Sequence, residues 1–284
     1  MVVRIVTDST ADLPTEVTSS AGITVVPLTV FFGDEAYLDG VELDNAGFYV
    51  KLAASKELPR TSQPPPAAFQ EAFQRLIDEG ADAILSVHLS SKLSGTYQSA
   101  CTARDSLPQG TREVPIVIID SASISVGMSY AIRQAAAMAS AGKELAEVQA
   151  LVEDILARTT ILAVLDTLEY VRRGGRIGSA SAMLGNMLSF KPIISLREGE
   201  VVPLERPRTR TKAYARVAQL LSEQQTIEHV AVAGSNAEVS QQLSEAVQSV
   251  YSGELPQYKL GAALGAHTGP GTAAIAFVLA KNSA

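Results

Sequence analysis

Short, continuous aliphatic runs alternate with helix-like segments through the first half of the chain. The strand candidates are residues 2–6, 23–32, 83–87 and 114–119. Between them, apolar residues recur at helical spacing, as in residues 69–77. Strands that are apolar on both faces are typical of a parallel sheet covered by helices on both sides. The sequence therefore predicts an α/β domain with a parallel sheet over residues 1–157.

After residue 157 the pattern changes. The strand candidates are residues 161–165, 192–196, 200–204, 229–233, 258–260 and 274–279. The helix candidates are residues 167–173, 180–187, 212–223 and 237–250. Glu198-Gly199-Glu200 has the composition of a tight hairpin turn, which indicates antiparallel pairs in this half. We expect a second α/β domain with a mixed sheet over residues 158–284.

The composition is unusually aliphatic for a globular chain. Hydrophobic residues make up 46% and aromatic residues 5%, with no Trp. A membrane segment, a large aliphatic core or an apolar ligand cavity would each explain this. A membrane helix needs about 18–20 consecutive apolar residues, and no run reaches that length. The net charge of −7 argues against nucleic-acid binding. With Cys101 alone and no signal-peptide pattern, we expect a cytoplasmic protein.

Familiar nucleotide and metal motifs are missing. There is no P-loop, and the G-x-G-x-x-A match at residues 269–274 leads into a strand candidate instead of a helix. The three histidines, His88, His229 and His267, are dispersed along the chain. We therefore expect no metal site and no nucleotide cofactor.

Two hydroxyl-rich stretches lie at the ends of predicted strands, where open α/β sheets bind ligands. One is residues 61–64; the other is residues 90–97, where we expect Ser94 to cap a helix. Gly95 leaves backbone N–H groups accessible there, and Thr96 adds a hydroxyl. A helix N-terminus of this kind binds anions. The alternative is that Ser94 only caps its helix.

A third stretch, residues 265–271, is rich in Gly and Pro and contains His267. We expect a loop with a defined path, in which His267 can hydrogen-bond an anion. The alternative is a surface turn. Ser94, Asp120 and His267 also suggest a catalytic triad, although no G-x-S-x-G motif surrounds the serine.

Arginine clusters twice in this acidic chain, and guanidinium groups suit phosphate or carboxylate partners. The alternative is that both clusters are solvated helix ends. The clustered residues are Arg172, Arg173, Arg176, Arg206 and Arg208.

Several motifs, in order along almost the whole chain, resemble those of the DegV family, the fatty-acid-binding subunits of bacterial fatty acid kinase. They are TDSTADLP at residues 7–14, YLDG at 37–40, TSQP at 61–64, SGTYQSA at 94–100, DS at 120–121, LEYVRRGGRI at 168–177, KPI at 191–193 and HTGPG at 267–271.

The resemblance implies a two-domain DegV-like fold, with a parallel three-layer N-terminal domain and a mixed-sheet two-layer C-terminal domain. It also implies one long-chain fatty acid in a tunnel between the domains. Thr61 and Ser94 would hold the carboxylate, with His267 in the same polar network. The full set of candidate carboxylate-binding residues is Thr61, Ser62, Ser94, Gly95, Thr96 and His267.

The resemblance further implies a carrier without catalytic residues, and no cofactor besides the bound fatty acid. Its partner would be an ATP-dependent kinase that converts the presented carboxylate to an acyl phosphate for phospholipid synthesis. The clustered arginines would belong to the polar network or to the kinase-docking surface, and contact with a membrane would be at most transient. Two other functions stay open: a hydrolase or acyltransferase using Ser94 and His267, and a lipid-responsive regulator.

Overall fold

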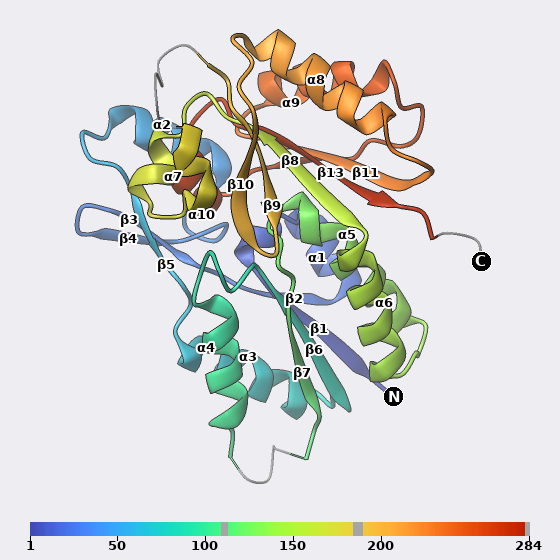
Figure 1. Ribbon diagram of the computed structural model, residues 1–284. Helices are drawn as coiled ribbons and strands as arrows, with labels where there is room; N and C mark the ends of the chain where they lie inside the picture. The colour runs from blue at the N-terminus through green and yellow to red at the C-terminus, as the bar shows by residue number, and fades with distance from the viewer. Residues whose placement is uncertain (109–112, 184–189, 282–284) are drawn as a thin grey trace.

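The computed structural model describes residues 1–108, 113–183 and 190–281. A parallel sheet, a mixed sheet and a small antiparallel sheet make up its β-structure, with helices between and around them (Figure 1). The α/β class expected from the sequence is confirmed.

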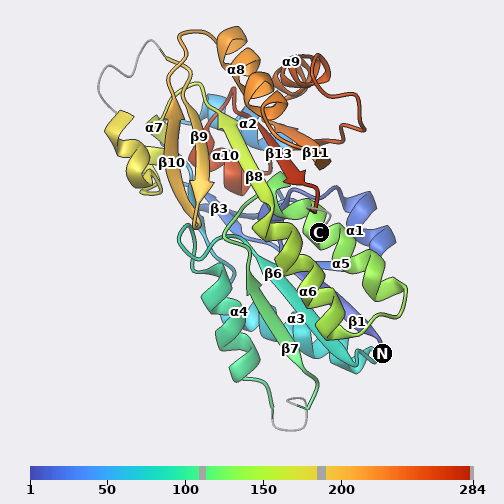
Figure 2. The same ribbon diagram turned by 45° about the vertical axis from the view of Figure 1, so that its right-hand side comes forward.

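The parallel sheet has the strand order β2-β1-β6-β7. Its strands are β1 (Val3–Asp8), β2 (Ile23–Val26), β6 (Ala83–His88) and β7 (Ile116–Asp120). Helices cover both faces, which makes three layers (Figure 2). One face carries α3 (Pro66–Asp78) and α4 (Thr96–Asp105), and the other carries α1 (Thr15–Ala21), α5 (Val126–Ser140) and α6 (Leu145–Ala157).

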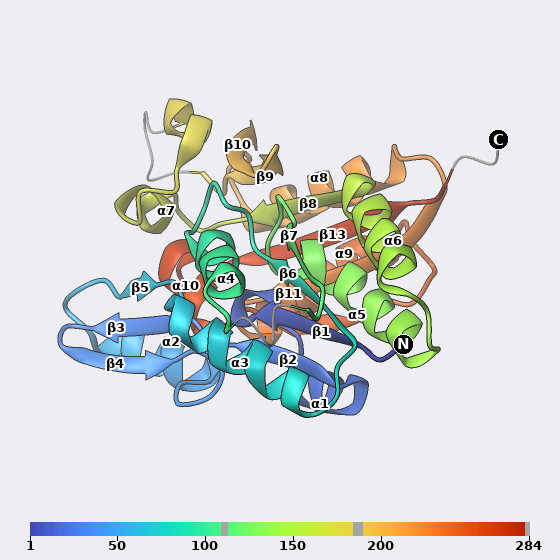
Figure 3. The same ribbon diagram turned by 90° about the horizontal axis from the view of Figure 1, so that it is seen from below.

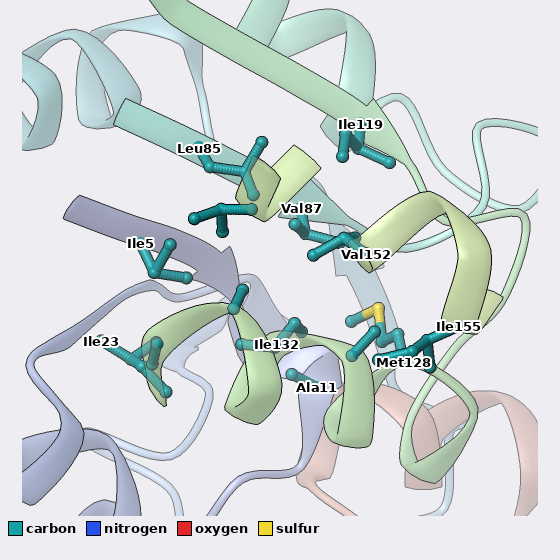
Figure 4. Close-up of a cluster of buried hydrophobic side chains, with 14 of the residues drawn as sticks. Ile5, Ala11, Ile23, Leu85, Val87, Ile119, Met128, Ile132, Val152 and Ile155 are labelled. Atoms are coloured by element: carbon teal, nitrogen blue, oxygen red, sulfur yellow. The ribbon is translucent and has the colours of Figure 1, made fainter. Parts of the chain in front are cut away.

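Aliphatic side chains fill the space between this sheet and α5 (Figure 4). Ile5 from β1 and Leu85 from β6 meet Met128 and Ile132 from α5. All four are essentially inaccessible to solvent. Because both faces of the sheet are covered in this way, its strands carry apolar residues at successive positions, as the sequence shows.

The single strand expected over residues 23–32 is wrong. Pro27 divides it, because proline cannot donate to a strand ladder. The first part is β2, while the second is β3 (Thr29–Phe32), which lies in another sheet. Between them, the backbone N–H of Leu28 donates to Ser9 Oγ (3.1 Å).

This other sheet, of strand order β4-β3-β5, was not foreseen from the sequence. It contains β3, β4 (Glu35–Leu38) and β5 (Arg60–Ser62), with α2 (Asn45–Ala54) between β4 and β5. Figure 3 shows β3 and β4 to one side of the parallel sheet. The small sheet and α2 pack through Val30 and Phe48 against α10 (Ala262–Thr268) from the far end of the chain.

The mixed sheet has the order β10-β9-β8-β13-β11-β12, with α8 and α9 covering one face. Its strands are β8 (Thr159–Val164), β9 (Ile193–Arg197), β10 (Glu200–Glu205), β11 (Ile227–Gly234), β12 (Gln257–Lys259) and β13 (Ala273–Leu279). The remaining helices here are α7 (Glu169–Arg173), α8 (Arg210–Ser222) and α9 (Ala237–Gln248). Thr209 and Asn236 cap α8 and α9 with their side-chain oxygens.

Two predictions in this half have different outcomes. The hairpin turn at Glu198-Gly199 is confirmed, since it joins antiparallel β9 and β10. For the helix expected at 180–187, the described part belongs to the 3-10 helix at Gly178–Met183, and the rest lies outside the described residues. In the part of the chain that the structure describes, no helix is both long and apolar enough to span a membrane.

Helix α5 lies between the parallel and mixed sheets and contacts both. Small side chains make this possible: Ala131, Ala135 and Ala136 are all buried. The chain passes from α6 into the mixed sheet at Arg158. A division into domains at residues 157 and 158 stays a prediction.

We predict that Ala135→Leu destabilises the protein by about 1–3 kcal/mol, because the added carbons enter a closely packed layer. The matched control is Ala137→Leu, which is exposed on the same helix and should change stability by less than about 0.5 kcal/mol. Urea unfolding of both variants measures this. Equal unfolding midpoints would contradict tight packing of α5 between the sheets.

Candidate functional site

A cavity lies among the mixed sheet, α10 and the loops that follow β1, β6 and β7. Residues from both halves of the chain line it. Most of the wall is aliphatic: Leu28, Leu89, Leu93, Ile124, Ile161, Ala163, Val171, Ile194, Leu196, Val201, Leu260, Ala263, Leu264 and Ala274. Such a wall suits an apolar ligand, because enclosing it removes apolar surface from water.

Polar side chains from four segments meet at one part of this cavity. Thr61 Oγ1 in β5 hydrogen-bonds His267 Nε2 in α10 (2.7 Å). Arg176 Nε donates to the carbonyl of Leu93, next to Ser94 (3.0 Å). Gln63 lies against Gly95, where a Cβ would be 3.0 Å from its Nε2. Thr61, Ser94 and His267 all line the cavity, so the fold brings three of the sequence-predicted residues to it.

His267 occupies a different local structure from the one expected. The loop predicted for residues 265–271 is wrong at its start, because His267 lies in the last turn of α10 and the loop begins after Thr268. Ala263, Leu264 and His267 follow one another at helical spacing and all line the cavity, so one face of α10 forms part of its wall. The position of α10 therefore sets the position of the imidazole.

The environment of His267 keeps its imidazole neutral. Burial, together with the smaller effect of the positive charge of Arg176, lowers the pKa of His267 from 6.5 to about 4. Its Nδ1 is buried with no hydrogen-bond partner among the described residues, and Gly174 packs directly against it. A buried unpaired N–H is rarer and costlier than an unpaired lone pair. This favours the tautomer with the proton on Nε2, which then donates to Thr61.

This tautomer leaves the Thr61 hydroxyl proton free for a ligand. Ser94 is arranged similarly. Its Oγ lies 3.3 Å from the Thr96 backbone N–H and 2.9 Å from Thr96 Oγ1. If Ser94 accepts both bonds, its own proton also faces outward. Two hydroxyl donors are the groups that a carboxylate requires when it leaves water.

The expected cap role of Ser94 is wrong in detail. Gly95 holds the N-cap position of α4, and Ser94 precedes it. Thr96 is the first residue of the helix and is buried. Ser62, Gly95 and Thr96 are neighbours of the cavity-lining residues, but their atoms do not line the cavity.

The clustered arginines separate into two groups. Arg176 lines the cavity near His267. Arg172 and Arg173 are exposed instead and form ion pairs with Glu169. The remaining pair, Arg206 and Arg208, is also exposed and does not line this cavity.

The triad geometry is not present. Asp120 Oδ1 accepts from the backbone N–H groups of Ser91 (3.1 Å) and Ala122 (2.9 Å). Among residues 1–108, 113–183 and 190–281, no hydrogen bond joins His267 to Ser94 or Asp120. No group of three or more His, Cys, Asp and Glu side chains within these ranges could hold a metal ion.

Other hydroxyls on the wall were missed from the sequence. Thr10 Oγ1 donates to Asp8 (2.5 Å), Ser125 Oγ donates to Asp12, and Thr272 Oγ1 donates to the carbonyl oxygen of Thr268 (3.0 Å). Their protons are thus committed to protein acceptors. The hydroxyl groups that can still donate to a ligand are those of Thr61 and Ser94.

Comparison with known proteins agrees with this architecture. The family model described as "Uncharacterised protein, DegV family" matches residues 2–280. The chain belongs to the DegV family. A DegV domain-containing protein of Halalkalibacterium halodurans is 35% identical over 284 residues, which is 98% of this chain and 99% of that protein.

Solved DegV structures share the whole fold. A DegV family protein from Thermus thermophilus, described with its fatty acid binding, has a TM-score of 0.88 at 32% identity, with 99% and 100% of the two chains covered. DegV from Bacillus subtilis, described as a fatty acid binding protein, has a TM-score of 0.86 at 31% identity, with the same coverage. The three-layer parallel part and the mixed-sheet part are therefore those of the DegV fold.

We predict that the ring of His267 titrates with a midpoint near pH 4, and that Arg176→Gln moves this midpoint upward by removing a nearby positive charge. Imidazole NMR shifts followed against pH measure it. Arg172→Gln is the control and should leave the midpoint unchanged, since Arg172 pairs with Glu169 outside the cavity. A wild-type midpoint near 6.5 would contradict the buried environment of His267.

Proposed function

We propose that this chain binds one long-chain fatty acid, with the acyl chain in the aliphatic cavity and the carboxylate at Thr61, Ser94 and His267. We further propose that it is a non-catalytic carrier, the fatty-acid-binding subunit of a fatty acid kinase, in the cytoplasm. The observation that carries this proposal is an aliphatic cavity whose free hydrogen-bond donors gather in one place. The fatty acid binding described for the Thermus and Bacillus proteins supports it.

The energetics of an acyl chain fit such a wall. Burying about 14 methylenes at about 0.8 kcal/mol each gives a ceiling near 11 kcal/mol. Loss of translational freedom and ordering of the chain reduce this substantially. The apolar cavity thus supplies affinity, while the polar side chains set the direction in which the ligand lies.

The carboxylate has partners that suit an anion. Thr61 and Ser94 can each donate a hydroxyl proton when they accept the hydrogen bonds from His267 and Thr96, and the guanidinium of Arg176 lines the same cavity. Hydrogen bonds to charged groups are stronger than neutral ones. Neutral His267 orients Thr61 and adds no charge of its own.

The same geometry disfavours a hydrolase or acyltransferase. A serine nucleophile needs a base within hydrogen-bonding reach. Ser94 pairs with Thr96, whereas His267 pairs with Thr61. We therefore keep esterase activity only as an outcome to be tested.

Presentation to a kinase requires that the carboxylate lie near the protein surface. Arg176 lines the cavity and is itself exposed, which supports an opening at this end. We propose that exposed Arg172 and Arg173, together with Arg206 and Arg208, contribute to the docking surface. The partner would be an ATP-dependent kinase that transfers phosphate to the carboxylate and yields an acyl phosphate.

Identification of the bound lipid tests the carrier proposal. Purified protein is denatured and extracted, and released lipids are identified by mass spectrometry. Fatty acid at about one per chain, and acyl phosphate formed with ATP and the kinase subunit, are the expected results. Binding without any kinase dependence would favour a regulator, and hydrolysis of an activated ester that is lost in Ser94→Ala would favour the hydrolase.

We predict that Thr61→Val and Ser94→Ala each weaken fatty-acid binding about tenfold, as expected when one hydrogen bond to a charged group is lost. The double variant should lose more. Isothermal titration with a fatty acid of 16 to 18 carbons measures it. Ser62→Ala is the matched control, since Ser62 lies on the same strand but off the cavity wall. Unchanged affinity in the double variant would overturn the carboxylate assignment.

A further inference from the structure

The first turn of α10 is held by two buried carboxyl groups from the other end of the sequence. Asp12 Oδ1 accepts from the backbone N–H of Gly261 (2.8 Å), and Asp39 Oδ1 accepts from that of Ala262 (2.8 Å). Their exposed fractions are 9% and 3%. The first N–H groups of a helix have no intrahelical acceptor, so these two bonds satisfy donors that would otherwise be unpaired.

Gly261 allows both carboxylates to approach so closely. A Cβ at this position would lie 3.0 Å from Asp12 Oδ1 and 3.2 Å from Asp39 Oδ1, which is tighter than ordinary contact. Asn45 adds a third hydrogen bond near the start of α10, since its Nδ2 donates to the carbonyl of Leu260 (2.6 Å). The start of α10 is therefore fixed from several sides at once.

Both acids are themselves held in place. Ser125 Oγ donates to Asp12 Oδ2, and Asp12 adopts the left-handed conformation (φ 53°), which Asp tolerates better than most residues. The backbone N–H of Asp39 donates to the carbonyl of Leu28 (2.9 Å). Hydrogen bonds thus connect the loops after β1 and β4 to the start of α10.

Two buried acids are a costly way to cap a helix of seven residues. Burial raises the pKa of both carboxyls, that of Asp12 to about 8. A serine or threonine would cap such a helix with less desolvation. What the acids add is a fixed location for α10, whose other end carries His267 about two turns away.

We propose that Asp12 and Asp39 are positioning residues that fix α10 so that His267 reaches Thr61 at the polar end of the cavity. Neither residue lines the cavity. Their effect on lipid selectivity rests on the proposed function, whereas their effect on His267 does not.

The direct test reads the environment of His267 without any lipid. In Asp39→Ala, loosened α10 should expose the imidazole, and its titration midpoint should rise from about 4 toward 6.5. Asp39→Asn should keep the low midpoint, because its amide oxygen can still accept from Ala262. Asp44→Ala is the control: Asp44 caps α2, which packs on α10, but it does not bond α10. An unchanged midpoint in folded Asp39→Ala would overturn the proposal.

Asp12→Ala provides a second test should Asp39→Ala not fold, and the same rise in the His267 midpoint is expected. Asp12→Asn should again preserve the wild-type value, because Asn resembles the protonated acid and keeps the acceptor for Gly261. If neither Ala variant alters the midpoint, the carboxylates act on stability alone and the proposal is wrong.

Selectivity provides the functional readout. The ratio of affinities for palmitate and hexadecanol isolates the head group, since both share one acyl chain. We expect Asp39→Ala to reduce this ratio at least fivefold, with Asp39→Asn and Asp44→Ala close to wild type. A wild-type ratio near one would contradict the proposed function. If wild type prefers palmitate and Asp39→Ala has the same affinity ratio as wild type, the positioning role is contradicted.

Discussion

An acid group buried in an apolar cavity must find hydrogen-bond donors there, and the site depends on this constraint. The wall is aliphatic over most of its area, and the hydroxyls of Thr10, Ser125 and Thr272 already donate to the protein. The hydroxyl groups that can still donate to a ligand are those of Thr61 and Ser94. An uncompensated carboxylate elsewhere in the cavity would cost several kcal/mol. Under the proposed function, the cavity would therefore bind an amphipathic ligand in one orientation.

The fold builds this arrangement from segments far apart in the sequence. The parallel sheet supplies the loop with Ser94, the small antiparallel sheet supplies Thr61, and α10 supplies His267. Helix α5 packs between the parallel sheet, whose loops carry Ser94, and the mixed sheet, whose strands supply much of the aliphatic wall. Each polar group is placed by a different element, so their convergence depends on the whole chain being folded. Asp12 and Asp39 extend this dependence to the first turn of α10.

Local pattern predicted the regular elements well. The strand at 83–87 could be predicted because both faces of β6 are buried and its residues are therefore continuously apolar. The hairpin between β9 and β10 could be predicted from the turn composition of Glu198-Gly199 alone. The break at Pro27 and the helical setting of His267 were missed, because short elements have weak local signals and α10 is held by distant groups. The family motifs pointed to Thr61 and Ser94, but no local pattern could pair Asp12 with Gly261 across 249 residues.

The most direct test of the central claim is a carbon NMR titration of bound palmitate labelled at its carboxyl carbon. If the carboxylate lies against the Thr61 and Ser94 hydroxyls, its resonance should be resolved from that of free palmitate. The carboxyl should stay ionised below its ordinary pKa, and Thr61→Val should shift the signal. A bound carboxyl that titrates as it does in water, and that does not respond to Thr61→Val, would contradict the account.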